Sequence, residues 1–191
     1  MRLFCAVELP AGTRQTLASA VAGARARLDR DGFDARWTPD ENLHLTVWFF
    51  GECDDAAADA LREKLSTPLP IPRFVMELGG AGVFPSSGVP SILWVGVRDG
   101  GASLSRLHTA LAVRLEPLGY RPEPRPFHPH VTIARVRGRP SAVLARAARE
   151  FGIDPMADAG RCGVADLTLF RSRLSPRGAR HEPVVRVPLK E

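Results

Sequence analysis

The chain has 191 residues, of which 45% are hydrophobic and 25% are charged. This length suits one compact domain or two small lobes, and this composition excludes a wholly disordered chain. The net charge is +5 at pH 7, which favours phosphorylated or polyanionic partners over acidic proteins.

Nothing in the sequence indicates a membrane or an oxidising compartment. No apolar run approaches the roughly 20 residues of a membrane-spanning helix, so we expect no membrane association. The apolar start of the chain ends at Glu8 and is too short for a secretory signal peptide. Three scattered cysteines, Cys5, Cys53 and Cys162, disfavour a disulfide scaffold and a cysteine zinc site. The cytoplasm is therefore the expected compartment.

The first half of the chain alternates strand and helix patterns. Leu17, Val21 and Leu28 recur at helical spacing, whereas residues 43–50 have the pattern of a strand. In chain order, the patterns predict a strand at 3–8, a helix at 13–30, a strand at 43–50, a helix at 54–65, a strand at 73–78 and a glycine-rich loop at 79–88.

The second half repeats this order. The patterns predict a strand at 92–97, a helix at 104–115, a strand at 130–136, a helix at 141–151 and a strand at 167–170. We therefore expect an internal duplication: one domain over 1–191, with similar lobes at about 1–80 and 90–175 and a C-terminal strand at 176–191. The expected fold class is α+β, with antiparallel sheets lining a central cleft and helices outside.

One triplet occurs once in each half, at 44–46 (His-Leu-Thr) and at 130–132 (His-Val-Thr). On a strand, alternate side chains share a face, so each His points the same way as its Thr while the middle residue points into the core. Two such strands from matched halves bring two imidazoles and two hydroxyls to one cleft.

This set of side chains suits hydrolysis of a phosphodiester. One neutral imidazole deprotonates water and one protonated imidazole protonates the leaving alkoxide, which predicts a bell-shaped pH profile. The hydroxyls of Thr46 and Thr132 donate to phosphate oxygens, and Arg135 adds positive charge. A metal site of His44, His128 and His130 is the alternative, but no carboxylate accompanies it, so we expect no metal.

Further segments extend these motifs. The paired triplets, with the Pro-His-x-Thr-x-x-Arg extension at 129–135, are the most specific features, and Ala-Val-Glu-Leu-Pro at 6–10 and Gly-Val-Phe-Pro at 82–85 add to them. On these residues the chain resembles the 2H phosphoesterase superfamily, and within it the RNA 2′,3′-cyclic phosphodiesterases, also described as 2′-5′ RNA ligase-like proteins. The resemblance runs nearly end to end, with further matching segments at 1–5, 36–37, 41–46, 49–52, 93–96 and 174–178.

The resemblance implies a bilobal, pseudo-two-fold fold with the site in its cleft. It implies that an RNA 2′,3′-cyclic phosphate end, including that of a tRNA fragment, is opened to a 2′-phosphate without a cofactor, and that 2′-5′ joining of tRNA halves accompanies this reaction. By position, His44 and His130 become the acid–base pair, while Thr46 and Thr132 bind phosphate. O3′ is then the leaving group, so we assign His44 as its acid and His130 as the base for water. A cleft built within one chain predicts a monomer.

Phe84 and a group of arginines near the C-terminus each allow two interpretations of their role. Phe84 either stacks on a nucleobase or fills a hydrophobic gap under the loop. The arginines at 171, 173, 177 and 180 form either a solvated face or a track for an RNA backbone. Two residues depart from the family pattern: Cys5 stands where an aliphatic residue is usual, and His181 where Tyr is common. A role of that Tyr therefore does not carry over to His181.

Two other functions remain open beside cyclic phosphodiesterase activity on RNA ends. One is a related enzyme that acts on a small cyclic nucleotide, a 2′-5′ oligonucleotide or an ADP-ribose cyclic phosphate. The other is a catalytically silent module that binds RNA ends. The identity of the product separates the enzymes from each other, and the two intact His-x-Thr triplets argue against the silent module.

Overall fold

The computed structural model describes residues 1–138, 140–142, 145–146, 158–175 and 178–191. The helical elements within them are α1 (Ala11–Arg30), η1 (Asp40–Asn42), α2 (Asp55–Lys64), α3 (Gly101–Leu115) and η2 (Glu116–Leu118). The strands are β1 (Arg2–Glu8), β2 (Ala35–Trp37), β3 (His44–Glu52), β4 (Leu69–Pro72), β5 (Phe74–Phe84), β6 (Ile92–Asp99), β7 (His130–Val136), β8 (Arg161–Val164), β9 (Asp166–Ser175) and β10 (Gly178–Lys190).

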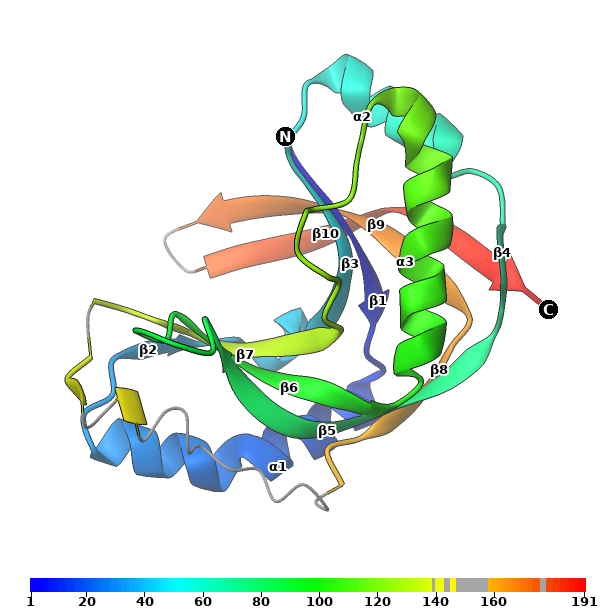
Figure 1. Ribbon diagram of the computed structural model, residues 1–191. Helices are drawn as coiled ribbons and strands as arrows, with labels where there is room; N and C mark the ends of the chain where they lie inside the picture. The colour runs from blue at the N-terminus through cyan, green and yellow to red at the C-terminus, as the bar shows by residue number, and fades with distance from the viewer. Residues whose placement is uncertain (139, 143–144, 147–157, 176–177) are drawn as a thin grey trace.

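The strands form one sheet in the order β4-β10-β9-β1-β3-β7-β6-β5-β8, and β2 pairs with β7 (Figure 1). Neighbouring strands are antiparallel apart from β4 and β10, which run parallel. At the centre, β3 and β7 pair through Leu45 and Val131, the one register position found for them in the described chain. In the strand order, β4, β10, β9 and β1 lie on the β3 side of this pairing, and β6, β5, β8 and β2 lie on the β7 side.

The last strand of each sequence repeat pairs with the first strand of the other repeat. β5 ends the first repeat but pairs with β6 of the second. β9 ends the second repeat but pairs with β1 of the first. Each half therefore combines strands from both parts of the chain, which ties the two parts into one unit. The duplication itself remains a prediction.

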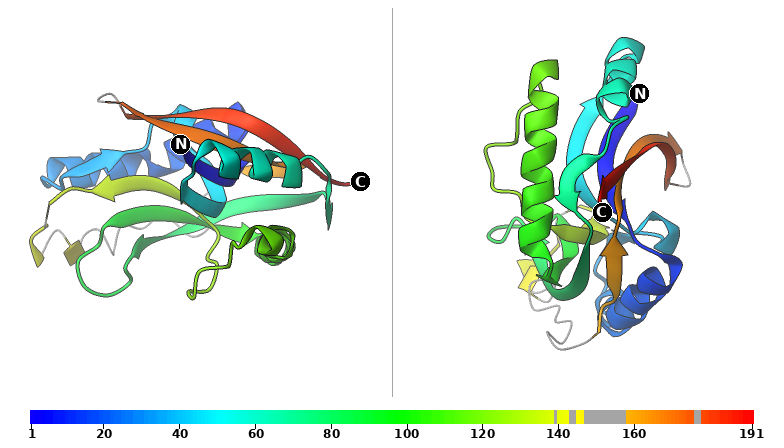
Figure 2. Two further views of the ribbon diagram at one scale, coloured as in Figure 1. Left: turned by 90° about the horizontal axis from the view of Figure 1, so that it is seen from above. Right: turned by 90° about the vertical axis from the view of Figure 1, so that its right-hand side faces the viewer.

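α1 and α3 lie on different sides of the molecule with the strands between them (Figure 2). α3 contacts β3, β4 and β6. Its buried leucines recur at helical spacing, as do the buried residues of α1, and both sets join one hydrophobic core with alternate residues of β1. These residues are Leu104, Leu107, Leu111 and Leu115 of α3, Leu17, Val21 and Leu28 of α1, and Leu3, Cys5 and Val7 of β1.

The α+β fold class predicted from the sequence is confirmed. The predicted strands and helices up to β7 are present with small shifts at their ends, and β9 and β10 lie at the predicted C-terminal strands. The short strands β2, β4 and β8 were not predicted. Most of the helix predicted at 141–151 lies outside the described residues. None of the described helices is long and apolar enough to cross a membrane.

The glycine-rich loop predicted at 79–88 is wrong over its first half, because β5 continues to Phe84. Gly80 has a φ of +69°, and the register of β5 on β6 shifts between Leu78 and Ala81. A Cβ on Gly82 would overlap the Trp94 ring of β6. Glycine is therefore required in this strand, because a side chain of the neighbouring strand occupies the space above it.

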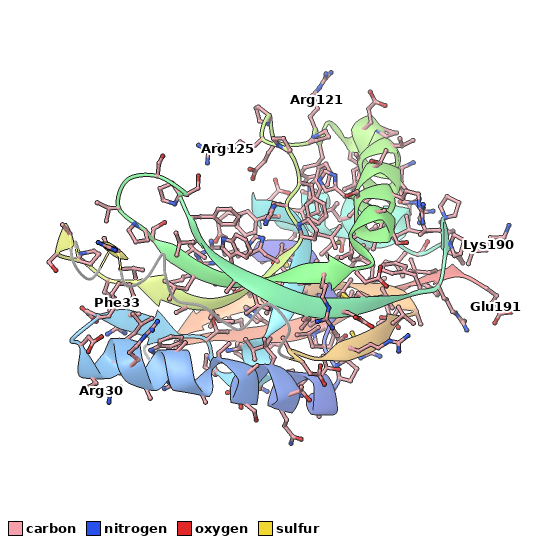
Figure 3. The ribbon with its side chains drawn as sticks, turned by 60° about the horizontal axis from the view of Figure 1, so that its bottom comes forward. Arg30, Phe33, Arg121, Arg125, Lys190 and Glu191 are labelled. Carbon is pink, nitrogen blue, oxygen red and sulfur yellow. The ribbon has the colours of Figure 1, made fainter. Side chains whose placement is uncertain are left out.

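The connection between η2 and β7 is held by aromatic contacts on its way to His130. Tyr120 meets Phe50 of β3 edge-on, with ring centroids 5.1 Å apart. Phe127 stacks on His108 of α3 with ring centroids 4.6 Å apart. Between these two contacts, the exposed Arg121 and Arg125 extend outward from the molecule (Figure 3). The chain thus enters β7 from a segment that is fixed at both ends.

Candidate active site

The two His-x-Thr triplets lie on the two central strands. Leu45 and Val131, the middle residues, face each other across β3 and β7 and have no exposed surface. The histidines and threonines are half-buried, on alternate positions of the same strands. Both triplets therefore adopt the alternation that the sequence predicts. Because both flank the same contact, the structure brings His44, Thr46 and Thr132 to one cleft. His130 is not in the described lining of that cleft but lies close enough for its charge to act on His44.

Both histidines are anchored in the same way. Nδ1 of His44 lies 2.7 Å from the carbonyl oxygen of Asn42, and Nδ1 of His130 lies 2.7 Å from that of His128. A carbonyl only accepts, so each Nδ1 carries a proton and donates it, and Nε2 is left to exchange protons with a ligand. Asn42 is itself held, because its side-chain amide donates to the carbonyl of Ala179 at 2.8 Å.

His44 also contacts the threonine of its own triplet. Its Nε2 lies 3.1 Å from Oγ1 of Thr46. When Nε2 carries no proton, the Thr46 hydroxyl donates to it, and when Nε2 is protonated, the hydroxyl accepts. The Thr46 hydroxyl proton is therefore free for a ligand oxygen only when Nε2 of His44 is protonated.

Burial lowers the pKa of both histidines. It brings the pKa of His44 to about 4, although the hydrogen bond to the Asn42 carbonyl opposes the change. The charges of His181, Arg135 and His130 lower the pKa of His44 further. Burial also lowers the pKa of His130, and the charges of His128 and Arg135 add to this effect. Both imidazoles are thus favoured in their neutral form until an anion enters the site.

A cleft of about 480 Å³ opens over the central strands. Its described lining contains no Asp or Glu. Three arginines, Arg2, Arg36 and Arg135, line it, and none of them forms an ion pair with a described residue. The cleft therefore suits an anionic ligand. Its lining is Arg2, Phe4, Arg36, Trp37, Thr38, Pro39, Asn42, His44, Thr46, Phe49, Thr132, Arg135, Ser172, Ala179 and His181.

A β-bulge follows the triplet in β3. Thr46 pairs with Ala6 and Trp48 with Cys5, so Val47 is the extra residue. Val47 and Trp48 are both buried, although they are consecutive. The bulge therefore turns Phe49 to the side of the cleft, where 48% of its surface is exposed.

β7 carries the same irregularity. Thr132 pairs with Trp94 and Ala134 with Leu93, so Ile133 is the extra residue. Ile133 and Ala134 are both buried, and Arg135 reaches the cleft beside Thr132. Strict alternation from His130 would turn Arg135 to the opposite face. The bulge accounts for its presence in the cleft.

Phe84 lies at the His130 side of the site, within a group of rings. It meets His130 edge-on at 5.0 Å between centroids and lies 5.2 Å from Trp94. His128 packs on Trp94 at 4.7 Å and on Phe84 at 5.6 Å. Phe84 therefore supports the His130 ring. Its stacking on a nucleobase remains a prediction.

The metal site weighed as an alternative does not form in the described part of the chain. No group of three or more His, Cys, Asp or Glu side chains there is close enough to hold a metal ion. The ring of His128 packs against Trp94 and Phe84.

The cleft residues that were not identified as site residues from the sequence include Arg2, Arg36, Phe49 and His181. Alternation along the strand did not place Phe49 in the cleft, because the bulge at Val47 reverses the alternation of β3. Arg36 lies on β2, a three-residue strand that no pattern predicted, where it pairs with Arg135. Arg2 directly precedes the strand predicted at 3–8 and belongs to the observed β1, so alternation continued back from Phe4 was the available signal.

Comparison with known proteins agrees with this geometry. A family model described as the 2′-5′ RNA ligase superfamily matches residues 13–175. The chain belongs to the 2′-5′ RNA ligase superfamily. Similar members include an RNA 2′,3′-cyclic phosphodiesterase of Aeropyrum pernix, 33% identical over 87% of this chain and 93% of the relative. An RNA 2′,3′-cyclic phosphodiesterase of Escherichia coli is 28% identical over 100% of this chain and 97% of the relative.

Solved structures of the family have the same fold. The crystal structure of E. coli LigT complexed with 3′-AMP is similar with a TM-score of 0.74 and 28% identity, covering 100% of this chain and 98% of that one. TT0787 of Thermus thermophilus is similar with a TM-score of 0.73 and 27% identity, covering 98% of this chain and 97% of that one. The resemblance seen in the sequence is thereby confirmed.

Proposed function

We propose that this protein hydrolyses the 2′,3′-cyclic phosphate at the end of an RNA to a 2′-phosphate, using two histidines and no metal. The observation that carries the proposal is the meeting of the two triplets at Leu45 and Val131, with both histidines held through Nδ1. The names of its relatives support the substrate class, since several are RNA 2′,3′-cyclic phosphodiesterases. The arginine-lined cleft supports an anionic substrate.

The chemistry needs one proton removed and one supplied. In the proposed assignment, Nε2 of His130 takes a proton from water, which attacks phosphorus, while Nε2 of His44 protonates O3′ as the P–O3′ bond breaks. A bound cyclic phosphate places a negative charge beside His44, and this charge favours its protonated form. Protonation of the acid is thereby coupled to substrate binding.

The two threonines and Arg135 are proposed to bind the phosphate. The hydroxyls of Thr46 and Thr132 donate to the non-bridging oxygens, and the guanidinium of Arg135 offsets the negative charge that grows as water adds. We further propose that Phe49 stacks on the terminal base, because its exposed aromatic ring lines the cleft. Arg2 lies over this ring, 4.9 Å from its centroid.

A comparison of substrates tests this proposal. The kcat/KM for a short RNA with a 2′,3′-cyclic phosphate end is measured against that for a 2′,3′-cyclic mononucleotide and a 2′-5′ dinucleotide. The proposal expects the RNA end to be the best substrate. Preference for the mononucleotide or the dinucleotide would favour the related small-molecule enzyme, and tight RNA binding with no turnover would favour the silent module.

The same RNA tests the proposed joining reaction and the proposed monomer. Incubation with a second RNA that has a 5′-hydroxyl, such as a matched tRNA half, yields a longer 2′-5′-linked product if joining occurs. Sedimentation of the active protein at assay concentration is expected to give the mass of one chain, because all cleft residues come from one chain.

A further inference from the structure

His181 is the one histidine of the cleft lining besides His44. It lies on β10 opposite Ser172 of β9, and both residues line the cleft. Its ring meets His44 edge-on, with centroids 5.1 Å apart and planes at 82°. It meets Phe4 in the same manner, with centroids 5.0 Å apart and planes at 81°. The ring is thus held from two sides, next to His44 in the cleft.

The two nitrogens of this ring have different surroundings. Nδ1 is buried and has no hydrogen-bond partner among the described residues. A buried N–H without an acceptor is costly and rare in proteins. The ring proton is therefore favoured on Nε2, on the edge away from Nδ1, where it can reach the open space that the ring lines. Burial also lowers the pKa of His181, so the neutral ring carries this single N–H near neutral pH.

Among the described residues, no acidic side chain lines the cleft to accept this proton. Arg2 of β1, Arg36 of β2 and Arg135 of β7 add positive charge to the cleft. Of the nearby carboxylates, Glu8 of β1 accepts from Thr168 and pairs with Arg186, and Glu182 of β10 pairs with Arg173 of β9. The N–H that points to the cleft is therefore suited to an anionic ligand.

We propose that His181 donates its Nε2 proton to the terminal phosphate of the bound RNA, beside His44, so that three imidazoles and not two contact the reacting end. The proposal rests on the proposed function, because it deepens the account of how that site holds its phosphate. No bond is made or broken at His181. It binds the phosphate, and the acid and base remain His44 and His130.

The test is a binding experiment that needs no turnover. Two labelled RNAs of one sequence are used, one with a 2′-phosphate end and one with a free 2′,3′-diol, and their Kd values are measured by fluorescence anisotropy. His181→Phe keeps the ring and its contacts with Phe4 and His44 but removes both nitrogens. The preference for the phosphate end is expected to fall about tenfold, which is typical of one hydrogen bond to a charged group.

Two further variants separate binding from folding. His181→Gln retains an N–H donor and is expected to keep an intermediate preference. His108→Phe is the matched control, because His108 stacks between Trp48 and Phe127 outside the cleft, and it is expected to keep the parent preference. The Tm of His181→Phe is expected to equal or exceed that of the parent, since the unpartnered buried nitrogen is gone.

The outcomes distinguish this proposal from the proposed function. An unchanged phosphate preference in His181→Phe would overturn the role of His181, as would an equal loss of affinity for both RNAs or a fall in Tm that explains the loss. Hydrolysis of the cyclic end by the parent protein is measured separately. If the parent prefers the phosphate end but does not hydrolyse the cyclic one, the proposed function fails and the role of His181 in binding stands.

Discussion

Phe49 and Arg135 occupy equivalent positions on the two central strands. Each follows its histidine by five residues, and each is turned into the cleft by a β-bulge, at Val47 in β3 and at Ile133 in β7. The two halves thus place different chemistry at matching positions: an aromatic ring beside one triplet and a guanidinium beside the other. The two central strands therefore differ chemically at this position.

This difference predicts that the two residues affect different kinetic constants. Phe49→Leu is expected to raise KM about tenfold with little change in kcat, because a stacked base contributes about 1–3 kcal/mol to binding. Arg135→Gln is expected to lower kcat by about tenfold to a hundredfold, because its charge offsets the charge that grows in the transition state. Steady-state kinetics on an RNA with a cyclic phosphate end measure both. A lower kcat in Phe49→Leu at unchanged KM would contradict the assignment.

The two histidines are expected to be indispensable. His44→Ala and His130→Ala are each expected to lower kcat at least ~10²-fold, the usual contribution of a positioned acid or base. His108→Phe, which changes a histidine outside the cleft, serves as the control and is expected to retain activity. Turnover within about threefold of the parent in either alanine variant would show that its imidazole transfers no proton.

The sequence predicts the residues of this site only where the strands keep regular alternation. The histidines and threonines lie where alternation along a strand places them. Phe49 could not be found in this way, because the bulge reverses the alternation, and nothing in the pattern of apolar residues marks Val47 as an extra residue. Tertiary context creates the irregularity, since the partner strand decides which residue is left unpaired.

The glycine-rich stretch of β5 shows the same limit in the fold. Glycine runs are typical of loops, yet Gly82 lies in a strand because the Trp94 ring of β6 occupies the space of its side chain. The reason lies twelve residues further along the chain and becomes visible only when β5 and β6 are paired. Contacts between distant residues therefore account for the differences in both fold and site.

The free energy of unfolding is expected to fall as the pH is lowered below the pKa of an ordinary histidine side chain. The pKa of His44 is about 4 in the folded protein against 6.5 for a free side chain. Between these values the unfolded chain binds more protons than the folded one, so acid favours unfolding. Urea denaturation is expected to give a lower free energy of unfolding at pH 5 than at pH 7.5. His44→Gln should reduce this difference, and an unchanged pH dependence in that variant would show that His44 is not its source.

Binding of the phosphate end is expected to reverse this shift. An anion beside His44 raises its pKa, so NMR titration of the His44 ring in the presence of a 2′-phosphate RNA should give a pKa above the value of about 4 in the free protein. The same RNA with a free diol end is the control and should leave the pKa of His44 nearly unchanged. Equal titration curves with the two RNAs would show that the phosphate does not bind beside His44.

Salt is expected to weaken RNA binding through the arginines of the cleft. Each phosphate contact contributes about 0.7 to the slope of log Kd against log salt for a single strand. Arg36→Gln is expected to reduce the slope by about this amount, since Arg36 lines the cleft without an ion pair to a described residue. Arg106→Gln, on the exposed surface of α3, is the matched control and should keep the parent slope. Equal slopes for the two variants would exclude Arg36 from the RNA contacts.

The most direct test of the two-histidine mechanism is the product formed from an RNA with a 2′,3′-cyclic phosphate end in the presence of EDTA. The mechanism predicts full turnover, because no metal takes part, and an end that carries only a 2′-phosphate, because O3′ is the leaving group. Loss of activity in EDTA, restored by added metal, would contradict the metal-free mechanism. A 3′-phosphate end would contradict the leaving group, and with it the role assigned to His44.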